Sequence, residues 1–313
     1  MGDLIKMLNI LVTGGSGQIG SNLRSEKKRG GYNYLFPSSS KLDITKKSSI
    51  ASFLNSNKLD IILNFAAYTD VDNAELEKKR ANEVNNIGAS NLSNLANKKK
   101  IEVIHFSTDY VFGKNQVGIH KSTDKHSPIN FYGKTKSLGE KSVLMNSDLN
   151  TVIRLASVCG EYGNNFIKTI LRLILTKNNI QVISDQKISI TNSKDIVTNI
   201  PYLIEFISKN NKLFNKKRVF NFTNKGYTSW FLVAKIIKKE TEEILNKKIS
   251  CKIIPIKSNQ WISLAKRPLD SRLKVEFNRF EKNNIIIRRW DDSIKDTVKN
   301  LLPIVLKELK DEK

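Results

Sequence analysis

The sequence predicts an α/β protein with a doubly wound parallel sheet, followed by a smaller α/β lobe. Two observations carry this prediction. Short apolar runs alternate with helical patterns between residues 8 and 155, as expected for parallel strands joined by helices. A glycine-rich turn follows the first run and opens a helix, as in dinucleotide-binding units. We place the dinucleotide-binding domain with the catalytic residues at 1–155 and the mainly substrate-binding lobe at 156–313, with chain crossings between them.

The first strand, Leu8–Val12, leads into the glycine turn. Gly14, Gly17 and Gly20 follow it with G-x-x-G-x-x-G spacing. Glycines permit a tight turn and let the backbone come close to a pyrophosphate at the N-terminus of the next helix. The context of strand, turn and helix therefore favours a Rossmann dinucleotide site over a merely structural turn.

The segment that follows the second strand, Tyr32–Phe36, indicates which cofactor binds. NAD-binding units usually carry an acidic residue at the end of this strand. Here Ser39 and Lys41 stand in a run of three serines and a lysine without an acid. Hydroxyls and a lysine suit a 2′-phosphate, so we expect NADPH, with NADH as the alternative. We place the adenine edge at Asp43-Ile44. The competing interpretation is a solvent-exposed serine loop that says nothing about the cofactor.

Three further strands complete the expected sheet. Ile61–Ala67 ends in small residues that leave room for a cofactor, and Ala74–Lys99 is expected to form a long helix or a helix pair. Ile101–Phe106 is the fourth strand and Thr151–Leu155 the fifth. Since ligands of such sheets bind at the carboxyl ends of the strands, Thr108, just after the fourth strand, should face the cofactor.

A tyrosine–lysine pair points to proton transfer. After a loop at 113–129, Asn130–Met145 is predicted to be helical, and it carries Tyr132 and Lys136 four residues apart on one face. A nearby ammonium should lower the pKa of the phenol, and such a phenol can exchange a proton with a substrate oxygen. Thr108 is placed to bond to the same oxygen. Alone, the pair is weak evidence.

After residue 155 the pattern is less regular. The expected elements are the helix Asn164–Leu175, the strand Gln181–Ser184, the helix Asp195–Ser208, the strand Val219–Phe222, the helix Thr228–Leu245, a basic loop at Ala265–Leu273, the helix Trp290–Leu306 and a frayed tail, Lys307–Lys313.

Composition excludes several classes of protein. With 39% hydrophobic and 27% charged residues, the chain is an ordinary globular protein. No apolar run approaches the roughly 20 residues needed to span a bilayer, and Met1–Lys6 does not begin a signal peptide, so we expect a cytoplasmic protein without a membrane partner. Cys159 and Cys251 are expected to be free thiols, and the three histidines form no metal motif.

The net charge of +23 raises the question of nucleic acid. The lysines are dispersed, and no basic run is interleaved with aromatics, so we expect no nucleic-acid partner. A positive field would instead help to recruit a diphosphate-bearing substrate.

Together, these segments resemble the dTDP-4-dehydrorhamnose reductase family of extended short-chain dehydrogenases/reductases. The resemblance runs from residue 7 to about residue 308. The matching segments are the glycine turn, the third-strand segment Asn64–Glu75, Ser107–Phe112, Tyr132–Lys136, Gly163–Phe166, Thr228–Trp230, and Arg267-Pro268 with Ser271–Leu273.

The resemblance implies hydride transfer from a nicotinamide to the C4 ketone of a nucleotide-linked 6-deoxy sugar, most simply dTDP-4-dehydro-L-rhamnose. Tyr132 would protonate the alkoxide, Lys136 would hold the nicotinamide ribose and tune Tyr132, and Thr108 would orient the carbonyl. The cofactor-binding residues would be Gly14, Gly17, Gln18, Ile19, Ser39, Lys41, Asp43, Ile44, Ala66, Ala67, Tyr68, Tyr132 and Lys136. The substrate-binding residues would be Thr108, Asp109, Asn165, Lys168, Trp230, Arg267 and Arg272.

Departures from the family pattern leave the sugar open. The segment after Arg154 usually continues Thr-Ser-Trp-Val-Tyr-Gly, but here it is Leu155–Gly160, so the aromatic that lines the sugar pocket is missing. Ile188 and Ile190 stand at positions where the family has a glycine and a proline. Asn22 stands where some members have a glutamate in a metal-bridged dimer, so we carry over no metal, while a homodimer stays open.

Two alternatives follow from this pattern. One is a reductase of a different 4-keto nucleotide sugar. The other is a non-catalytic regulatory subunit that binds the dinucleotide, against which the intact Thr108, Tyr132 and Lys136 argue. Dehydration is disfavoured because no glutamate follows Asp109.

Overall fold

The computed structural model describes residues 7–26, 31–114, 117–209, 218–276 and 284–312. Its centre is a six-stranded parallel sheet with the order β2-β1-β3-β4-β5-β9. The strands are β1 (Asn9–Thr13), β2 (Asn33–Leu35), β3 (Ile61–Asn64), β4 (Glu102–Thr108), β5 (Thr151–Leu155) and β9 (Val219–Asn221). The order reverses between β1 and β3, which is where doubly wound sheets bind their ligands. The predicted fold class is confirmed.

Helices cover both faces of this sheet. On one face, α1 (Gln18–Ser25) and α8 (Ser193–Lys209) share an apolar core with the strands. On the other face, α2 (Lys47–Ser56) and α5 (Ala89–Lys98) cover the β1–β4 part of the sheet, and α6 (Phe131–Asn146) packs beside α5. The central strands are buried on both faces, which explains their continuous apolar sequences.

The predicted helix Ala74–Lys99 is divided into shorter segments. These are α3 (Asn73–Leu76), α4 (Lys78–Asn82), a π-helical turn (Glu83–Gly88) and α5. In the π turn, the Asn85 amide accepts a hydrogen bond from Tyr68 N–H (2.8 Å) and donates to Tyr68 O (3.0 Å) and Thr135 Oγ1 (3.1 Å). The irregular turn thus fixes the chain that leaves β3 against α6. Such π bulges often occur near functional sites.

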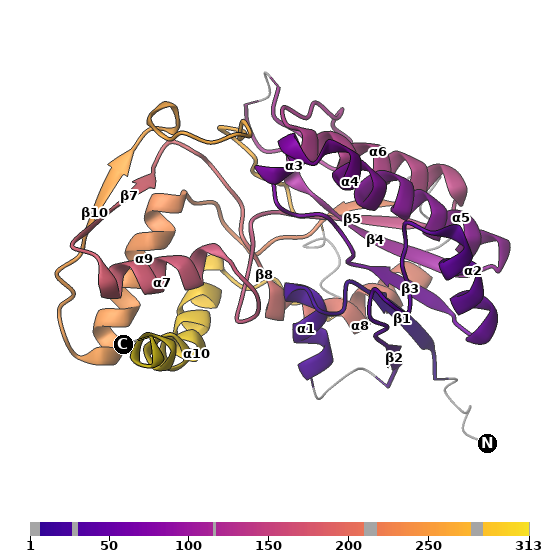
Figure 1. The fold of residues 1–313 in the computed structure, drawn as a ribbon, viewed down its shortest axis with the longest axis horizontal. Coiled ribbons are helices and arrows are strands. Elements are labelled where there is room, and N and C mark those ends of the chain that lie inside the picture. The colour runs from indigo at the N-terminus through magenta and orange to yellow at the C-terminus, as the bar shows by residue number, and fades with distance from the viewer. Residues whose placement is uncertain (1–6, 27–30, 115–116, 210–217, 277–283, 313) are drawn as a thin grey trace.

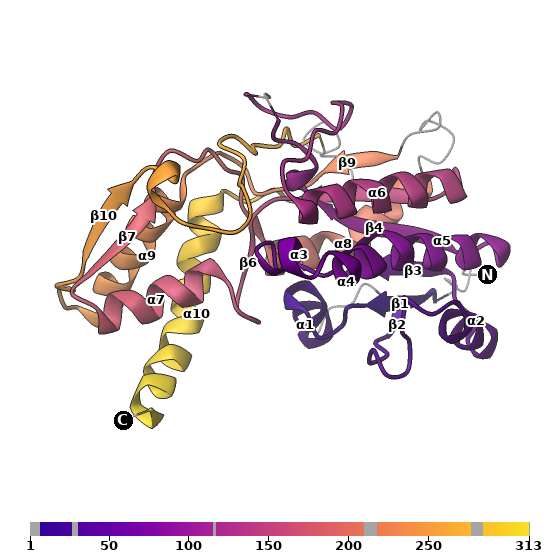
Figure 2. The same ribbon diagram turned by 45° about the horizontal axis from the view of Figure 1, so that its top comes forward.

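A second lobe lies at one end of the molecule (Figures 1 and 2). Its helices α7 (Phe166–Thr176), α9 (Trp230–Leu245) and α10 (Trp290–Asp311) share one apolar core with a parallel pair of strands, β7 (Asn179–Ile183) and β10 (Lys252–Ile256). The sequence had not predicted β10. It lies beside β7, and its Ile256 belongs to the buried residues.

The expected fraying of the tail from Lys307 is wrong, because α10 continues to Asp311. Its last turns are tied to α7 by ion pairs. Lys168 Nζ lies 2.7 Å from Glu308 Oε1, and Arg172 lies 3.1 Å from Glu308 and 2.6 Å from Glu312. The charges that suggested a solvated tail are therefore contacts between two helices.

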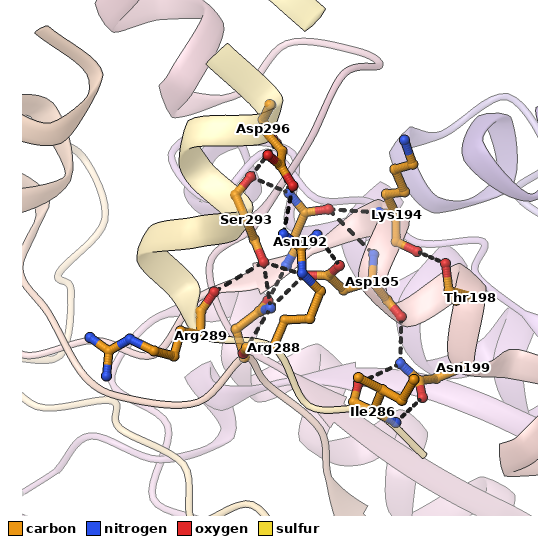
Figure 3. A network of polar contacts seen from close by, with 12 residues as sticks. Asn192, Lys194, Asp195, Thr198, Asn199, Ile286, Arg288, Arg289, Ser293 and Asp296 are labelled. Atoms are coloured by element: carbon orange, nitrogen blue, oxygen red, sulfur yellow. Dashed lines mark hydrogen bonds and ion pairs between the residues drawn. The ribbon is translucent and has the colours of Figure 1, made fainter. Parts of the chain in front are cut away.

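The chain passes from the second half back to the sheet, since α8 and β9 both pack there (Figure 2). A buried polar network holds this crossing together (Figure 3). Asp195, in the first turn of α8, accepts hydrogen bonds from Asn224 (2.5 Å) and from Ser293 of α10, and it pairs with Arg288 at 3.2 Å. The network joins α8, the segment after β9 and the start of α10.

None of the helices in the described ranges is both long enough and apolar enough to cross a bilayer. Cys159 and Cys251 are buried and unbonded to each other.

Candidate active site

A cavity of about 1030 Å³ opens at the carboxyl edge of the sheet, next to the second lobe. The glycine turn, the ends of β3 and β4 and the start of α6 line it from one domain. Gly163, Asn164 and Trp230 line it from the other part of the chain. The volume is at the upper end of the usual range for ligand pockets, which suits a long ligand such as a dinucleotide with a second molecule beside it.

The glycine turn fits a dinucleotide phosphate. Gly14 has φ +68°, and a Cβ there would lie 2.6 Å from Ala66 N. A Cβ on Gly20 would lie 2.4 Å from Gly14 O, so both positions require glycine. Gly17 is the N-cap of α1. Because glycine has no side chain, this position leaves the helix terminus open to a ligand. Backbone N–H groups at a helix N-terminus bind anionic groups.

Most of the predicted cofactor residues line the cavity, but Lys41 does not. Ser39, Asp43 and Ile44 line the cavity, as do Gln18, Ile19, Ala66 and Ala67. Lys41 is exposed and is absent from the lining among the described residues. Instead Arg24 lines this part, with its guanidinium 5.1 Å from the centre of the Phe36 ring. Sequence reasoning missed Arg24, although its place in the last turn of the helix after the glycine turn was a usable signal.

Asp43 organises its own loop. Its carboxylate accepts hydrogen bonds from Thr45 N–H (3.0 Å) and Thr45 Oγ1 (2.7 Å). The bond from the Thr45 side chain holds the pKa of Asp43 below its usual value. Tyr68, by contrast, is fixed through its backbone by Asn85 and is outside the cavity lining of the described chain.

Thr108 and Tyr132 lie together in the cavity wall. Thr108 ends β4, and its hydroxyl donates to Asp109 Oδ1 (3.0 Å) while accepting from Tyr110 N–H (3.2 Å). Tyr132 occupies the first turn of α6, where Asn130 Oδ1 caps the helix by accepting from Gly133 N–H (2.8 Å). Burial raises the pKa of Tyr132 to about 12, against a lowering effect of its hydrogen bond with Thr108.

The expected lowering of the Tyr132 pKa by Lys136 is wrong. Lys136 Nζ donates to Phe106 O (2.7 Å) and lies 3.3 Å from His105 Nε2, so the ammonium is directed at β4. Burial lowers the pKa of Lys136 to about 8, although Glu140 acts in the opposite direction. Tyr132 is therefore a neutral phenol near neutral pH, ready to give a proton rather than to accept one.

Asp109 lies beside these groups and is almost fully buried. Burial raises the pKa of its carboxyl to about 7, while hydrogen bonds from Ser271 and Thr108 lower it. Its Oδ2 has no hydrogen-bond partner within the described structure and belongs to a cavity-lining residue.

The predicted substrate residues fall into two groups. Trp230 lines the cavity with Thr108 and Asp109, and its indole N–H donates to Gln186 Oε1 at 3.1 Å. Four others make protein contacts and lie outside the lining of the described part. These are Asn165, which caps α7, Lys168, paired with Glu308, Arg267, paired with Asp72, and Arg272, paired with Asp270. As substrate ligands these four stay predictions.

Ser157 marks the departure from the family pattern. It lines the cavity and has φ +43°, a conformation that non-glycine residues rarely adopt. Ile188 is buried in the core of the second lobe. Asn22 is also buried, and its amide donates to Ser193 Oγ (2.7 Å) and Gln18 O (3.2 Å).

Residues 8–302 match the family model described as the RmlD substrate binding domain. The chain belongs to this family. It is 36% identical to a dTDP-4-dehydrorhamnose reductase of Aggregatibacter actinomycetemcomitans over 276 residues, covering 86% of this chain and 91% of the relative. It is 31% identical to the enzyme of that name from Sinorhizobium fredii, covering 94% and 98%. The resemblance inferred from the motifs is confirmed.

Solved structures agree with this membership of the RmlD family. A dTDP-4-dehydrorhamnose reductase of Clostridium acetobutylicum superposes with a TM-score of 0.85 at 30% identity, covering 94% of this chain and 99% of that chain. The Bacillus anthracis enzyme of that name, solved in complex with NADP, gives a TM-score of 0.82 at 28% identity, covering 93% and 98%.

Proposed function

We propose that this protein is an NADPH-dependent reductase that acts on the C4 ketone of a nucleotide-linked 6-deoxy sugar. The simplest reaction is dTDP-4-dehydro-L-rhamnose to dTDP-L-rhamnose, a precursor of surface polysaccharides. The observation that carries the proposal is the meeting of Thr108 and Tyr132 in the wall of the cavity that the glycine turn also lines. Relatives that share most of the chain's length bear this enzyme name.

The residues of the chain divide the chemistry among them. The bound nicotinamide supplies a hydride to the ketone carbon. Tyr132, neutral because its pKa is about 12, donates a proton to the ketone oxygen. We assign Thr108 to hold that oxygen, which requires its hydroxyl to donate to the ketone in place of Asp109 Oδ1. We assign Lys136, whose ammonium contacts Phe106 O and His105, to hold the nicotinamide ribose. The negative charge that develops on the ketone oxygen during the reaction is stabilised by hydrogen-bond donors that are positioned before the reaction begins.

The direct test supplies dTDP-4-dehydro-L-rhamnose and NADPH to the purified protein. We expect stoichiometric loss of NADPH and a product with the NMR spectrum of dTDP-L-rhamnose. A protein that binds NADPH but turns over no 4-keto nucleotide sugar would instead support a dinucleotide-binding regulatory subunit.

A second substrate within the same chemistry is favoured by Ser157. This small residue lines the cavity where the family pattern has an aromatic, so the sugar site has a different shape. We would therefore offer a panel of 4-keto nucleotide sugars that differ in nucleotide and in ring substituents. Turnover of another member with an inert rhamnose precursor would replace the simplest substrate and leave the reaction type unchanged.

We propose that Arg24 contacts the 2′-phosphate of NADPH, and a substitution of Arg24 tests this. We expect Arg24→Ala to raise the KM for NADPH by about tenfold or more, since a charge-assisted contact to phosphate is worth about 1.5–3 kcal/mol. The KM for NADH should stay the same, because NADH lacks the 2′-phosphate. Lys41→Ala is the matched control, since Lys41 is exposed and outside the cavity lining of the described residues. An NADPH-specific loss in Lys41→Ala alone would place the phosphate on the serine loop.

A further inference from the structure

Three buried side chains form a hydrogen-bonded ladder across neighbouring strands. Thr13 on β1 is the register partner of Asn64 on β3, and Asn64 is the partner of His105 on β4. Thr13 Oγ1 lies 2.7 Å from Asn64 Oδ1, and Asn64 Nδ2 lies 3.0 Å from His105 Nδ1. Asn64 and His105 are fully buried. Because register partners point to the same face of the sheet, this ladder follows from the strand pairing.

The ladder ends on Lys136. His105 Nε2 lies 3.3 Å from Lys136 Nζ, whose other contact is Phe106 O at 2.7 Å. At its opposite end the ladder reaches Thr13, which lines the cavity directly before the glycine turn. The four side chains therefore connect a catalytic residue to the start of the cofactor site. The catalytic roles assigned to Thr108 and Tyr132 do not use Thr13, Asn64 or His105.

The hydrogen-bonding groups allow two arrangements of the ladder. In the first, Thr13 donates to the Asn64 carbonyl and the Asn64 amide donates to His105 Nδ1. A neutral His105 then carries its proton on Nε2, and this N–H requires the lone pair of an uncharged Lys136 amine. In the second, the Lys136 ammonium donates to Nε2, His105 Nδ1–H donates to the Asn64 carbonyl, and the turned Asn64 amide donates to Thr13.

The ammonium of Lys136 suits only the second arrangement, whereas an uncharged amine, with a lone pair as well as N–H groups, is compatible with either. An ammonium cannot face an Nε2–H, because both groups are donors. Passing from the second arrangement to the first releases one proton from Lys136 to solvent, moves the His105 proton from Nδ1 to Nε2, and turns the Asn64 amide. An amide turn of this kind exchanges two groups of the same size and leaves the packing unchanged.

We propose that His105 is a positioning residue whose tautomer is coupled to the charge of Lys136, so that the Thr13–Asn64–His105 ladder holds the catalytic lysine in its charged state. The proposal concerns Lys136 itself and holds for any substrate of the cavity.

The surrounding charges agree with this coupling. Burial lowers the pKa of His105 well below its usual range and Lys136 lowers it further, while Glu140 opposes them, so His105 stays neutral. The Lys136 pKa of about 8 places its titration in an accessible range. Glu140, on the same helix, is itself paired with Arg154 of β5 and faces His126 of the 113–129 loop. Tyr132, the other titratable group on the helix, is neutral until about pH 12.

The first test observes the tautomer directly in the wild-type protein. Imidazole ¹⁵N shifts distinguish Nδ1–H from Nε2–H, and the His105 signals are those missing from His105→Gln. Between pH values on either side of the Lys136 pKa of about 8, we expect a change from Nδ1–H at low pH to Nε2–H at high pH. Lys136→Met should abolish the change. A tautomer that is constant across this range in the wild type, or the same change in Lys136→Met, would overturn the proposal.

The second test measures the pH dependence of turnover in three histidine variants. His105→Phe removes the acceptor for the ammonium, so we expect the basic limb of the kcat profile to move down by about one pH unit, the value of one charged hydrogen bond. His105→Gln keeps a hydrogen-bond acceptor for the ammonium, so its basic limb should lie close to that of the wild type. His120→Gln, at a buried histidine outside the ladder, is the matched control and should leave the limb in place.

The two tests separate the possible failures. A lower kcat in both His105 variants without movement of the basic limb would mean a purely structural role and would contradict the proposal. If the protein reduced none of the offered sugars, the proposed function would fail, whereas the NMR measurement on the free protein would still decide the coupling.

Discussion

Tyr132→Phe is expected to lower kcat by about 10²–10⁴-fold, the usual contribution of a general acid, while NADPH binding is retained. The phenol is the group placed beside Thr108 in the cavity wall, and its pKa of about 12 keeps it protonated near neutral pH. The ring of phenylalanine fills the same space, so the loss reports the missing proton donor. Turnover with the 4-keto sugar and NADPH affinity by fluorescence titration give the two readouts.

Tyr202→Phe is the matched control, since Tyr202 is on α8 and packs against the main core away from the cavity. It should keep wild-type kcat. If Tyr132→Phe retained full turnover, another group would supply the proton, and Asp109 with its pKa of about 7 would be the first residue to test. If the protein had a biological effect that Tyr132→Phe left unchanged, the regulatory-subunit alternative would gain support.

Arg154→Met is expected to destabilise the fold by about 3–5 kcal/mol, as is typical when one partner of a buried ion pair is removed. Arg154 donates three hydrogen bonds to Glu140, at 3.0, 3.1 and 2.8 Å, and both side chains are almost completely buried. Without the guanidinium, the Glu140 carboxylate would be left in the core with His126 beside it and the Lys136 ammonium farther along the helix. Urea denaturation followed by circular dichroism measures the change in the free energy of unfolding.

Arg172→Met provides the comparison for this substitution. Arg172 also pairs with carboxylates, those of Glu308 and Glu312, but these groups are partly exposed, so we expect a loss of no more than about 1 kcal/mol. Equal losses in the two variants would mean that burial does not strengthen the Glu140–Arg154 pair.

The same pair predicts an acid-sensitive contribution to stability. Burial raises the pKa of Glu140, but Arg154 and His126 outweigh it and hold the folded pKa at about 2, below the ordinary value of 4.5. A lowered folded pKa gives stability that is present above pH 4.5 and is lost as the pH falls toward 2. In order of magnitude this contribution is about 3 kcal/mol. Arg154→Met should therefore show a weaker loss of stability over this acid range than the wild type.

The parallel sheet was predictable because its strands are buried on both faces and appear as continuous apolar runs between helices. The glycine turn was predictable because glycine positions record backbone geometry that other residues cannot adopt, as Gly14 and Gly20 show. The meeting of Thr108 and Tyr132 followed from their places at the end of a strand and the start of the next helix.

Other features depended on contacts between distant segments. Lys168, predicted as a substrate ligand, has a partner that the sequence could not indicate, since α10 brings Glu308 within 2.7 Å of it. The final charges Glu308 and Glu312 seemed to belong to a frayed tail until α7 supplied their partners. Arg24 lines the cavity only because α1 directs it toward the end of β2, where it lies over Phe36.

The sequence by itself determined the fold class, the family, the glycine turn and the side chains that we propose to be catalytic, because each depends on local spacing along one or two elements. Only the tertiary structure decided the charge states of those side chains. Four residues of helix bring Tyr132 and Lys136 to one face, but burial raises the pKa of the phenol, and Phe106 and His105 direct the ammonium toward β4. The electrostatic environment of a buried group is set by strands and helices that are distant in sequence, and no local pattern records it.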